Sequence, residues 1–225
     1  MRSRTSVTRE PVHHPLFARF YARCGPVMDA RAGFGAHRED ALAGLTGRVI
    51  EIGAGSGLNF RHYPRAVSEV VAIEPERHLR RLAADAARRA DVPVDVVPGV
   101  AEALPVKSEG FDAAVASLVL CSVRDQKRAL AELHRVLRPG GELRLLEHCR
   151  GESRGQVALQ WAADHTLWPL LFGGCRTGRD TLSAVEAAGF ELLELRRFRV
   201  PERAKGLTLP LPSSSHILAI ARRPA

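Results

Sequence analysis

The sequence predicts an α/β fold: a doubly wound, mostly parallel, seven-stranded sheet with helices on both faces. Three observations lead to this prediction. Short β-branched runs alternate with amphipathic helical segments, which is the pattern of βαβ units on a parallel sheet. The 225 residues are 45% hydrophobic and 26% charged, as in a globular domain. No internal repeat or low-complexity linker interrupts the chain, so we expect one domain over residues 1–225.

Seven runs are predicted to be strands, because each is short, rich in Val, Ile or Leu, and bounded by turn residues. They are residues 48–52, 70–73, 94–97, a strand within 111–120, 142–147, 191–198 and 216–221. The strands alternate with helices through most of the chain, so we expect most of the sheet to be parallel.

Helices are predicted where apolar residues recur at helical spacing. In residues 76–90 the apolar stripe consists of Leu79, Leu82, Ala83 and Ala86. The other predicted helical segments are 15–46 in two parts, a helix after the first glycine-rich turn, 125–136, 155–172 and 181–188. The Arg-Pro-Gly-Gly run at 138–141 and a Gly at 189 are helix-terminating signals.

The net charge of +8 would suit nucleic acid or an anionic membrane. However, only three of the 33 basic residues are Lys, and the Arg residues form no block of like charges. We interpret them as a dispersed basic surface. Aromatic residues make up 5% of the chain, which leaves little for stacking on single-stranded nucleic acid. A nucleic-acid partner is therefore not expected.

The chain has four cysteines: Cys24, Cys121, Cys149 and Cys175. They stand in no CxxC or Cys/His ligand spacing, so we expect reduced thiols and no metal site. His13 and His14 lack a third ligand at suitable spacing. The first fifteen residues lack the apolar core of a signal peptide, and no apolar run is long enough to span a membrane. These features predict a cytoplasmic protein without a membrane span.

A glycine-rich turn follows the first predicted strand. Residues 49–57 read Val-Ile-Glu-Ile-Gly-Ala-Gly-Ser-Gly, and Gly53, Gly55 and Gly57 would let the chain turn sharply while a ligand approaches the backbone. The GxGxG spacing is one residue shorter than the dinucleotide fingerprint GxGxxG, and no Lys of a phosphate-binding P-loop follows. The turn therefore favours a cofactor other than NAD or a nucleoside triphosphate.

Glu74 stands at the carboxyl end of the second predicted strand, twenty-one residues after Gly53. A carboxylate there can accept hydrogen bonds from two ribose hydroxyls. In open α/β sheets ligands bind outside the carboxyl ends of the strands, at the topological switch point. The turn and Glu74 together predict a cofactor that contains a nucleoside.

Five features together resemble the class I S-adenosylmethionine-dependent methyltransferases. They are residues 51–57, Glu74, 99–105, Phe111-Asp112 and the Leu-Arg-Pro-Gly-Gly run at 137–141, within a region of resemblance from 46 to 150. Residues 118–123, Glu147-His148 and 172–175 further resemble the methyltransferase-like proteins of animals that methylate alkyl thiols, and their bacterial relatives. The sequence is also similar, less specifically, to ubiquinone/menaquinone and phospholipid methyltransferases. The animal proteins carry an N-terminal membrane anchor that we do not find here.

This resemblance implies S-adenosylmethionine as the cofactor, and a set of residues that binds it. The backbone of the glycine turn would hold the methionine part, with Glu51 and Asn59 near its amino and carboxylate groups, and Glu74 would bind the ribose. The complete implied set is Tyr21, Glu51, Gly53, Ala54, Gly55, Gly57, Asn59, Glu74, Pro75, Val100, Ala101, Glu102, Ser117 and Leu118.

Three groups of residues in this set need separate comment, because one departs from the family pattern and two lie outside the glycine-rich turn. Family members often have Asp or Asn in place of Val100, so adenine would be contacted by the backbone at 100–101 and by Glu102. Ser117 and Leu118 would line the cofactor near its methyl group. Tyr21 would contact the cofactor from an N-terminal lid.

The acceptor of the methyl group is predicted from the residues just after the fourth strand. An Asn/Asp-Pro-Pro-aromatic element, typical of enzymes that methylate nucleobase amino groups, is replaced by Ser-Leu-Val-Leu at 117–120. We therefore expect a small thiol or lipophilic acceptor. Alternatives are a quinone precursor or phospholipid headgroup as acceptor, and a non-catalytic nucleoside- or RNA-binding module.

Methyl transfer requires alignment of acceptor, methyl carbon and sulfur, with a base in support. His148 and Asp164 are the predicted catalytic residues. The competing interpretations are that His148 only bonds backbone and that Asp164 and His165 cap a helix or face solvent; His216 is interpreted as structural. Cys121 and Cys175 are interpreted as small buried residues. We expect 1–46 to form a lid, 47–150 the cofactor-binding core, and 151–225 the acceptor-side helices and final strands.

Overall fold

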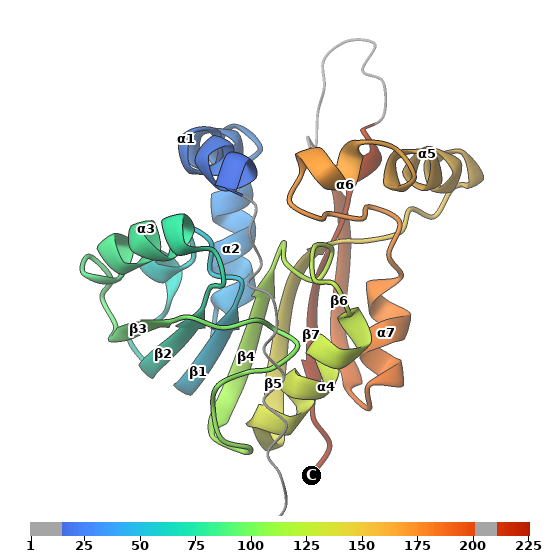
Figure 1. Ribbon diagram of the computed structural model, residues 1–225. Coiled ribbons are helices and arrows are strands. Elements are labelled where there is room, and N and C mark those ends of the chain that lie inside the picture. The colour runs from blue at the N-terminus through green and yellow to red at the C-terminus, as the bar shows by residue number, and fades with distance from the viewer. Residues whose placement is uncertain (1–14, 201–210) are drawn as a thin grey trace, which may run out of the picture.

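The computed structural model describes residues 15–200 and 211–225. Seven strands form one sheet in the order β3-β2-β1-β4-β5-β7-β6 (Figure 1). The strands are β1 Gly47–Ile52, β2 Val67–Ile73, β3 Val94–Val97, β4 Phe111–Ser117, β5 Leu137–His148, β6 Glu191–Arg199 and β7 Ser215–Arg222. The helices are α1 Pro15–Arg31, α2 Phe34–Leu42, α3 Arg77–Ala87, α4 Gln126–Val136, α5 Arg154–Asp164, α6 Trp168–Leu171 and α7 Thr181–Ala187, with short 3₁₀ turns η1 Phe60–His62 and η2 Pro212–Ser214.

The strand pairing places the switch point of the sheet beside the glycine-rich turn. β1 pairs in parallel with both β2 and β4, and the β2–β3 and β4–β5 pairs are also parallel. β7 pairs antiparallel with β5 and β6. The chain runs outward from β1 through β2 to β3, then returns to β4 and continues to β5. The point where the order reverses therefore lies between β1 and β4.

Alternating side chains on the strands bury two faces, which confirms the predicted α/β class. Ile50 and Ile52 of β1 pack in one core with Leu130 of α4. Val49 of the same strand belongs to the other core, with Ala83 of α3. The side chains of Ile50 and Ile52 are fully buried, and each such burial stabilises the fold by roughly 2–3 kcal/mol.

The predicted helix after the glycine-rich turn is wrong. Only the three-residue turn η1 follows it. Pro64 disfavours the helical conformation at the residue before it, and Tyr63 is accordingly extended, with ψ 128°. The short stretch between Gly57 and Pro64 leaves no room for a regular helix.

Two other segments differ in extent from their prediction. The apolar region 155–172 is divided into α5 and α6, because His165 after α5 leaves helical geometry at φ −101° and ψ 9°. β5 begins at Leu137, so the Arg-Pro-Gly-Gly run ends α4 but then belongs to the strand. A register irregularity between Phe111 and Ala113 on β4 accommodates this early start.

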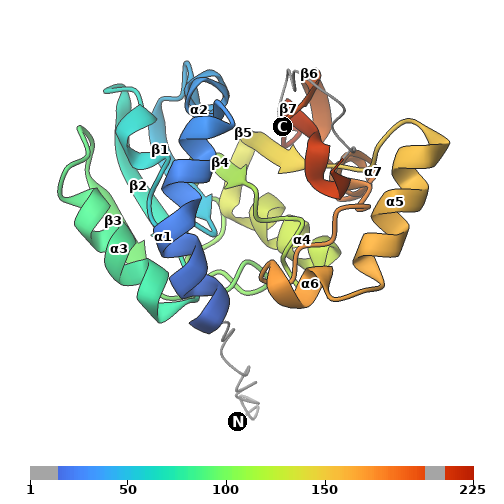
Figure 2. The ribbon, with the colours of Figure 1, turned by 90° about the horizontal axis from the view of Figure 1, so that it is seen from above.

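Three helices gather at the end of the sheet where the parallel strands finish. α1 lies on one side of this end, and α5 and α6 lie on the other (Figures 1 and 2). α1 contacts α2 and α3, and α5 follows β5 directly. None of the helices in the described ranges is long and apolar enough to cross a membrane.

Candidate active site

The glycine-rich turn after β1 is shaped by close contacts that only glycine allows. Gly53 has φ 61°, and a Cβ there would lie 2.2 Å from the Val119 side chain. Gly57 has φ 81°, and a Cβ there would lie 2.7 Å from the Phe60 ring. The left-handed backbone and the tight contacts both exclude larger residues. The turn is therefore held against the connection after β4.

Glu74 at the end of β2 is bonded to this turn. Its Oε2 accepts a hydrogen bond of 2.7 Å from the Gly55 N–H, and its Oε1 accepts one of 2.8 Å from the Glu76 N–H. The side chain is 4% exposed, and burial raises the pKa of its carboxyl to about 7. Ala54 joins the turn to β2 as well, since its N–H donates to the Ile73 carbonyl at 3.2 Å. Pro75 follows Glu74 and is partly exposed.

A buried polar network joins the end of β1 to the end of β4. The Asn59 side-chain amide donates to Glu51 Oε1 at 2.9 Å and to Ser117 Oγ at 3.1 Å. The Tyr63 hydroxyl donates to Glu51 Oε2 at 2.7 Å. Burial raises the pKa of Glu51 to about 7, although the bonds from Tyr63 and Asn59 act in the opposite direction. Predicted residues Glu51, Asn59 and Ser117 are thus brought together.

Arg38 of α2 adds a buried cation that sequence reasoning missed. Its Nη1 donates to Asn59 Oδ1 at 2.7 Å, and its Nε and Nη2 donate to Asp29 Oδ1 at 3.1 and 2.7 Å. Arg38 is 4% exposed and Asp29 is 7% exposed. The sequence carries no motif for this pair, because α1 and α2 supply one member each and the fold joins them.

Tyr21 of α1 lies over the glycine-rich turn, and its contact with a cofactor stays a prediction. A Cβ on Gly55 would lie 3.4 Å from its ring. The ring of Phe17 stacks on Tyr21 with centroids 5.7 Å apart. Phe17 also lies against Gly173, where a Cβ would come within 2.6 Å of its ring. α1 therefore reaches from the turn to the connection before α7. His13 and His14 lie outside the described residues.

The residues predicted to contact adenine form a tight turn after β3. Val100 bridges to Ala103, and Ala101 is buried in the core. The Glu102 carboxylate accepts hydrogen bonds from the Arg124 and Asp125 N–H groups at 2.8 and 3.3 Å, so it stabilises the connection before α4. A contact between Glu102 and a cofactor stays a prediction.

The connection after β4 is strained and is held by Glu147 of β5. Leu118 has φ 56°, which is uncommon for a residue with a branched side chain. Glu147 Oε1 accepts hydrogen bonds from the Val119 and Leu120 N–H groups at 2.9 and 2.8 Å. Glu147 is fully buried, and its Oε2 has no hydrogen-bond partner among the described residues. Burial raises its pKa to about 7.

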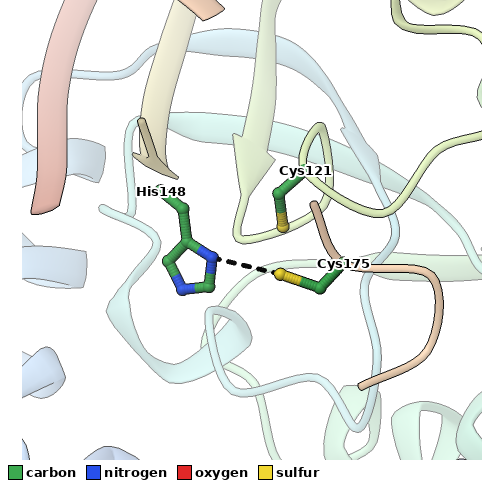
Figure 3. Close-up of side chains that lie close together, drawn as sticks. All are labelled: Cys121, His148 and Cys175. Carbon is green, nitrogen blue, oxygen red and sulfur yellow. Dashed lines mark hydrogen bonds between the residues drawn. The ribbon is translucent and has the colours of Figure 1, made fainter. Parts of the chain in front are cut away.

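Cys121, His148 and Cys175 meet at the carboxyl ends of β4 and β5 (Figure 3). Cys121 follows β4, His148 ends β5 and Cys175 lies between α6 and α7. The Cys175 Sγ lies 3.4 Å from His148 Nδ1. Both cysteines are buried and His148 is partly exposed. A hydrogen bond from the Cys121 thiol lowers the pKa of Cys175. Burial opposes a charge on His148, but Cys121 and Glu147 outweigh it and raise the pKa of His148.

The carboxylate of Asp164, the other predicted catalytic residue, is hydrogen-bonded to the loop at residues 177–178. Its Oδ1 accepts hydrogen bonds from the Thr177 N–H at 2.6 Å and the Thr177 hydroxyl at 3.1 Å. Its Oδ2 accepts one from the Gly178 N–H at 3.0 Å. These contacts give Asp164 the role of holding the loop that carries Cys175, so the structure offers no support for a direct role in chemistry.

The two alternative histidines differ from each other and from His148. His165 is exposed and bonds to the Trp161 carbonyl through Nδ1 at 2.7 Å. His216 is 3% exposed, bonds to the Ser214 carbonyl at 3.0 Å, and has its pKa lowered to about 3 by burial. Its ring lies 4.7 Å from that of His148. Only His148 combines a titratable ring with partial exposure in this cluster.

The site residues follow the strand order along one edge of the sheet. Glu74, Gly53, Ser117 and His148 stand at or just after the ends of β2, β1, β4 and β5, which are consecutive neighbours about 4.8 Å apart. We call the Gly53–Gly57 turn with Arg38, Glu51, Asn59 and Glu74 the glycine-loop half, and Cys121, His148 and Cys175 the Cys–His half.

Comparison with known proteins assigns the family. A family model described as "Methyltransferase domain" matches residues 50–145. The thiol S-methyltransferase TMT1A of Homo sapiens is 35% identical over 166 residues, which cover 71% of this chain and 67% of that protein. This chain belongs to the class I S-adenosylmethionine-dependent methyltransferases. The methyltransferase is thus an enzyme with S-adenosylmethionine as its methyl donor, which excludes the alternative of a non-catalytic binding module.

Two further similarities show the range of this methyltransferase's relatives. The demethylmenaquinone methyltransferase of Renibacterium salmoninarum is 38% identical over 109 residues, covering 48% of this chain and 44% of that protein. The solved S-adenosylmethionine-dependent methyltransferase of Mesorhizobium loti superimposes with a TM-score of 0.62 at 22% identity, covering 87% of this chain and all of that one. The second likeness shows the shared fold.

The glycine-loop half of the methyltransferase fits S-adenosylmethionine chemically. The cofactor's methionine end carries one ammonium and one carboxylate group, and this half places the Arg38 guanidinium and the Glu51 carboxylate on either side of Asn59. Glu74 offers a carboxylate to the ribose hydroxyls at the neighbouring strand end. The glycine backbone between them leaves space for a ligand to approach closely.

Proposed function

We propose that this methyltransferase transfers a methyl group to the sulfur of a small or lipophilic thiol. The observation that carries the proposal is the Cys–His half, which follows the ends of β4 and β5, next to Ser117 in strand order. The similarity to a human thiol S-methyltransferase supports the same acceptor. In this proposal residues 15–46 close over the site, 47–150 hold the cofactor and 151–225 shape the acceptor side, in the cytoplasm.

Bound S-adenosylmethionine supplies a methyl group on a positively charged sulfur, and a thiolate is a much better nucleophile for it than a thiol. The residues here must therefore take the acceptor's proton. His148 is suited to this task, because an imidazole can accept a proton and, although burial lowers its pKa, Cys121 and Glu147 outweigh burial and raise it. Gln160 and Asp164 keep the surrounding loops in place through bonds to Cys149 and Thr177.

Apolar side chains at the same end of the molecule support a lipophilic acceptor. α1 lies on one side of this end, and α5 and α6 on the other (Figure 2). Large hydrophobic side chains are exposed on all three helices: Phe20, Val27, Met28, Trp161, Leu170 and Leu171. Such side chains lower the cost of bringing an apolar molecule to the site.

A panel of acceptors tests this proposal. We expect S-methyl products from small alkyl thiols, detected by mass spectrometry with isotope-labelled S-adenosylmethionine. Phenols, quinone precursors and phospholipids serve as competing acceptors in the same assay. Methylation of one of these classes without any thiol product would contradict a thiol acceptor while leaving the methyltransferase activity intact.

Two variants separate the predicted catalytic residues. His148→Gln should lower kcat about 100-fold or more, as loss of a general base does, with little change in unfolding temperature. Asp164→Asn should instead lower the free energy of unfolding by about 1–3 kcal/mol, because one side-chain oxygen replaces two acceptors. Equal losses of kcat in well-folded variants would restore a chemical role to Asp164.

A quinone precursor is the second candidate acceptor, favoured by the similarity to the demethylmenaquinone methyltransferase. It requires methylation at carbon, so the product carries a new C–CH₃ bond that survives treatments that cleave S-methyl groups. The chain covers less than half of that relative, and methylation of a quinone precursor would use the same methyl donor. This candidate therefore shares the cofactor site and differs at the acceptor.

A further inference from the structure

The Cys–His half has the composition and spacing of a metal site. One imidazole nitrogen and two thiol sulfurs lie within 4.8 Å of one another. Three atoms this close share a point within about 2.8 Å of each, and zinc needs about 2.3 Å to sulfur and 2.0–2.1 Å to nitrogen. Side-chain movements of about half an ångström would therefore complete the three bonds. The 3.4 Å separation of Cys175 Sγ and His148 Nδ1 already matches one edge of a zinc tetrahedron, about 3.5 Å.

The loops that carry Cys121 and Cys175 are hydrogen-bonded to each other. Arg179 donates to the Leu120 and Val123 carbonyls at 2.6 Å each. The Arg176 N–H donates to the Cys121 carbonyl at 2.9 Å. These bonds fix the separation of the two loops without a disulfide between Cys121 and Cys175, which are both free cysteines. A preformed arrangement of this kind lowers the cost of binding an ion.

Glu147 is close in the structure to two residues of the cluster, His148 and Cys121. It precedes His148 on β5, and its Oε1 holds the two N–H groups just before Cys121. Its Oε2 is buried without a partner among the residues that the structure describes. Its bonds to the Val119 and Leu120 N–H groups position the connection that carries Cys121, and its negative charge would balance part of the charge of an ion bound at the cluster. Glu147 is therefore a positioning residue in this arrangement.

We propose that Cys121, His148 and Cys175 bind one zinc ion and leave its fourth position open for the acceptor thiol. Two cysteines and a histidine form a soft ligand set that suits zinc rather than magnesium or calcium. Three protein ligands with one open position are the pattern of catalytic zinc. Both cysteines are buried, whereas His148 is partly exposed, so the accessible side of the cluster is beside His148.

The ion would give the cluster a specific role, and this part rests on the proposed thiol acceptor. When a thiol binds, its S–H bond breaks, the proton passes to solvent, and the sulfur lone pair forms the fourth bond to zinc. The acceptor is then held as a thiolate at neutral pH. In the zinc-bound enzyme His148 is a ligand, so this proposal replaces the role of base that His148 has in the thiol methylation proposed above for the metal-free chain.

The first experiment measures metal content. The full chain is purified under nitrogen with a non-thiol reductant, incubated with zinc, passed through metal-free gel filtration, and analysed for zinc by mass spectrometry. We expect one zinc per chain. Cys121→Ser and Cys175→Ser should each weaken zinc binding at least about 100-fold, the upper end of what loss of an outer-sphere partner costs. Cys149→Ser is the matched control, because Cys149 is buried nearby but lies outside the cluster.

Cobalt provides a readout of the ligands. Cobalt(II) in place of zinc should show a thiolate-to-cobalt charge-transfer band and the strong visible bands of tetrahedral coordination, both absent from the two cysteine variants. The site would be overturned if the wild-type chain bound no metal. It would also be overturned if Cys121→Ser and Cys175→Ser bound metal as tightly as the wild-type chain. A Cys121–Cys175 disulfide found by peptide mass spectrometry under the same conditions would overturn it as well.

A second titration tests the open position. Adding 2-mercaptoethanol to the cobalt-loaded chain should increase the charge-transfer band, because a further thiolate joins the ion. A spectrum that does not respond would leave a purely structural ion and contradict the acceptor role. Calorimetric binding of S-adenosylhomocysteine is measured in parallel. Loss of thiol methylation on chelation with unchanged cofactor binding supports the zinc role, whereas thiol methylation by the metal-free chain contradicts it and leaves the proposed function standing.

Discussion

The two halves of the site use buried polar groups in different ways. In the glycine-loop half, the carboxylate oxygens of Glu51 and Glu74 all have hydrogen-bond donors within the chain. In the Cys–His half, Glu147 keeps one buried oxygen without a partner among the described residues, beside two thiols and an imidazole. The carboxylates of the first half are thus fully bonded, and its unbonded buried atom among the described residues is the neutral Ser56 hydroxyl, whereas the second half leaves a carboxylate oxygen unbonded.

This difference teaches how each half meets its ligand. In the proposed site, the backbone turn and carboxylates of the first half would bind a cofactor whose polar groups replace or join existing bonds. The second half is lined by groups that favour a soft atom or ion. We therefore expect cofactor binding to depend on the turn and its carboxylates, and handling of the acceptor to depend on thiol and imidazole chemistry. Variants of the glycine-loop half and of the lid over it test this division.

The largest effect is expected at Gly53, where backbone shape is decisive. Gly53→Ala should destabilise the fold by about 2–5 kcal/mol, the sum of a left-handed alanine and a clash with Val119, and should abolish calorimetric binding of S-adenosylhomocysteine. Gly140→Ala is the control, because Gly140 has φ 78° but open space around its Cβ position. It should cost about 1–2 kcal/mol and leave binding unchanged. Equal losses would show that the contact with Val119 does not shape the turn.

The next largest effect is expected at one of the two glutamates that are predicted to contact the cofactor. Substitution of Glu74 should weaken binding, whereas substitution of Glu102 should not. Glu74→Gln should weaken S-adenosylhomocysteine binding about 10- to 100-fold, because a hydrogen bond to a charged group contributes about 1.5–3 kcal/mol. Glu102→Gln should change binding by less than about 0.5 kcal/mol, the usual range away from a site, since its carboxylate serves the Arg124 and Asp125 N–H groups. A comparable loss in Glu102→Gln would place that carboxylate at the adenine after all.

The raised pKa of Glu74 predicts a smaller, pH-dependent effect. The ionised carboxylate is the form that would accept hydrogen bonds from the ribose hydroxyls, and with a pKa of about 7 it becomes neutral as the pH falls. Affinity for S-adenosylhomocysteine should therefore rise about 5- to 10-fold between pH 6 and 8, and binding should release a proton to buffer. Calorimetry in buffers of different ionisation enthalpy measures both quantities. The Glu74→Gln variant should lack this dependence; an unchanged pH profile in that variant would assign it to another group.

The smallest effect is expected on the lid. Tyr21→Ala should raise KM for S-adenosylmethionine about 2- to 10-fold, the range of one lost aromatic contact. Tyr21→Phe should stay close to wild type, because the ring that covers Gly55 remains. Steady-state kinetics at saturating acceptor gives both values. A loss in Tyr21→Phe as large as in Tyr21→Ala would show that the hydroxyl, and not the ring, contacts the cofactor.

Much of the fold could be predicted because its signals are local. The run Val94–Val97 is a strand by composition and by structure, and the order of strands and helices follows from their alternation. The helix expected after the glycine-rich turn failed because a single proline, Pro64, overrides the general pattern. The division between α5 and α6 has a comparable signal in Pro169, which lies in the first turn of α6 and cannot continue the hydrogen bonding of a preceding helix.

The candidate site shows the same limit. The glycine turn, Glu51 and Asn59 lie within nine residues of one another, so a sequence pattern can reveal them. Arg38 reaches Asn59 only after α2 packs on the sheet. The Cys–His half joins residues 121, 148 and 175, whose separations match no metal-ligand spacing, so only the topology of the sheet brings them together.

Helix α1 touches both halves, through Tyr21 at Gly55 and Phe17 at Gly173. One helix thus contacts both the glycine-rich turn and the loop that carries Cys175. If α1 acts as the proposed lid, both substrates would enter before it closes and both products would leave after it opens. We therefore expect sequential kinetics, with intersecting double-reciprocal plots.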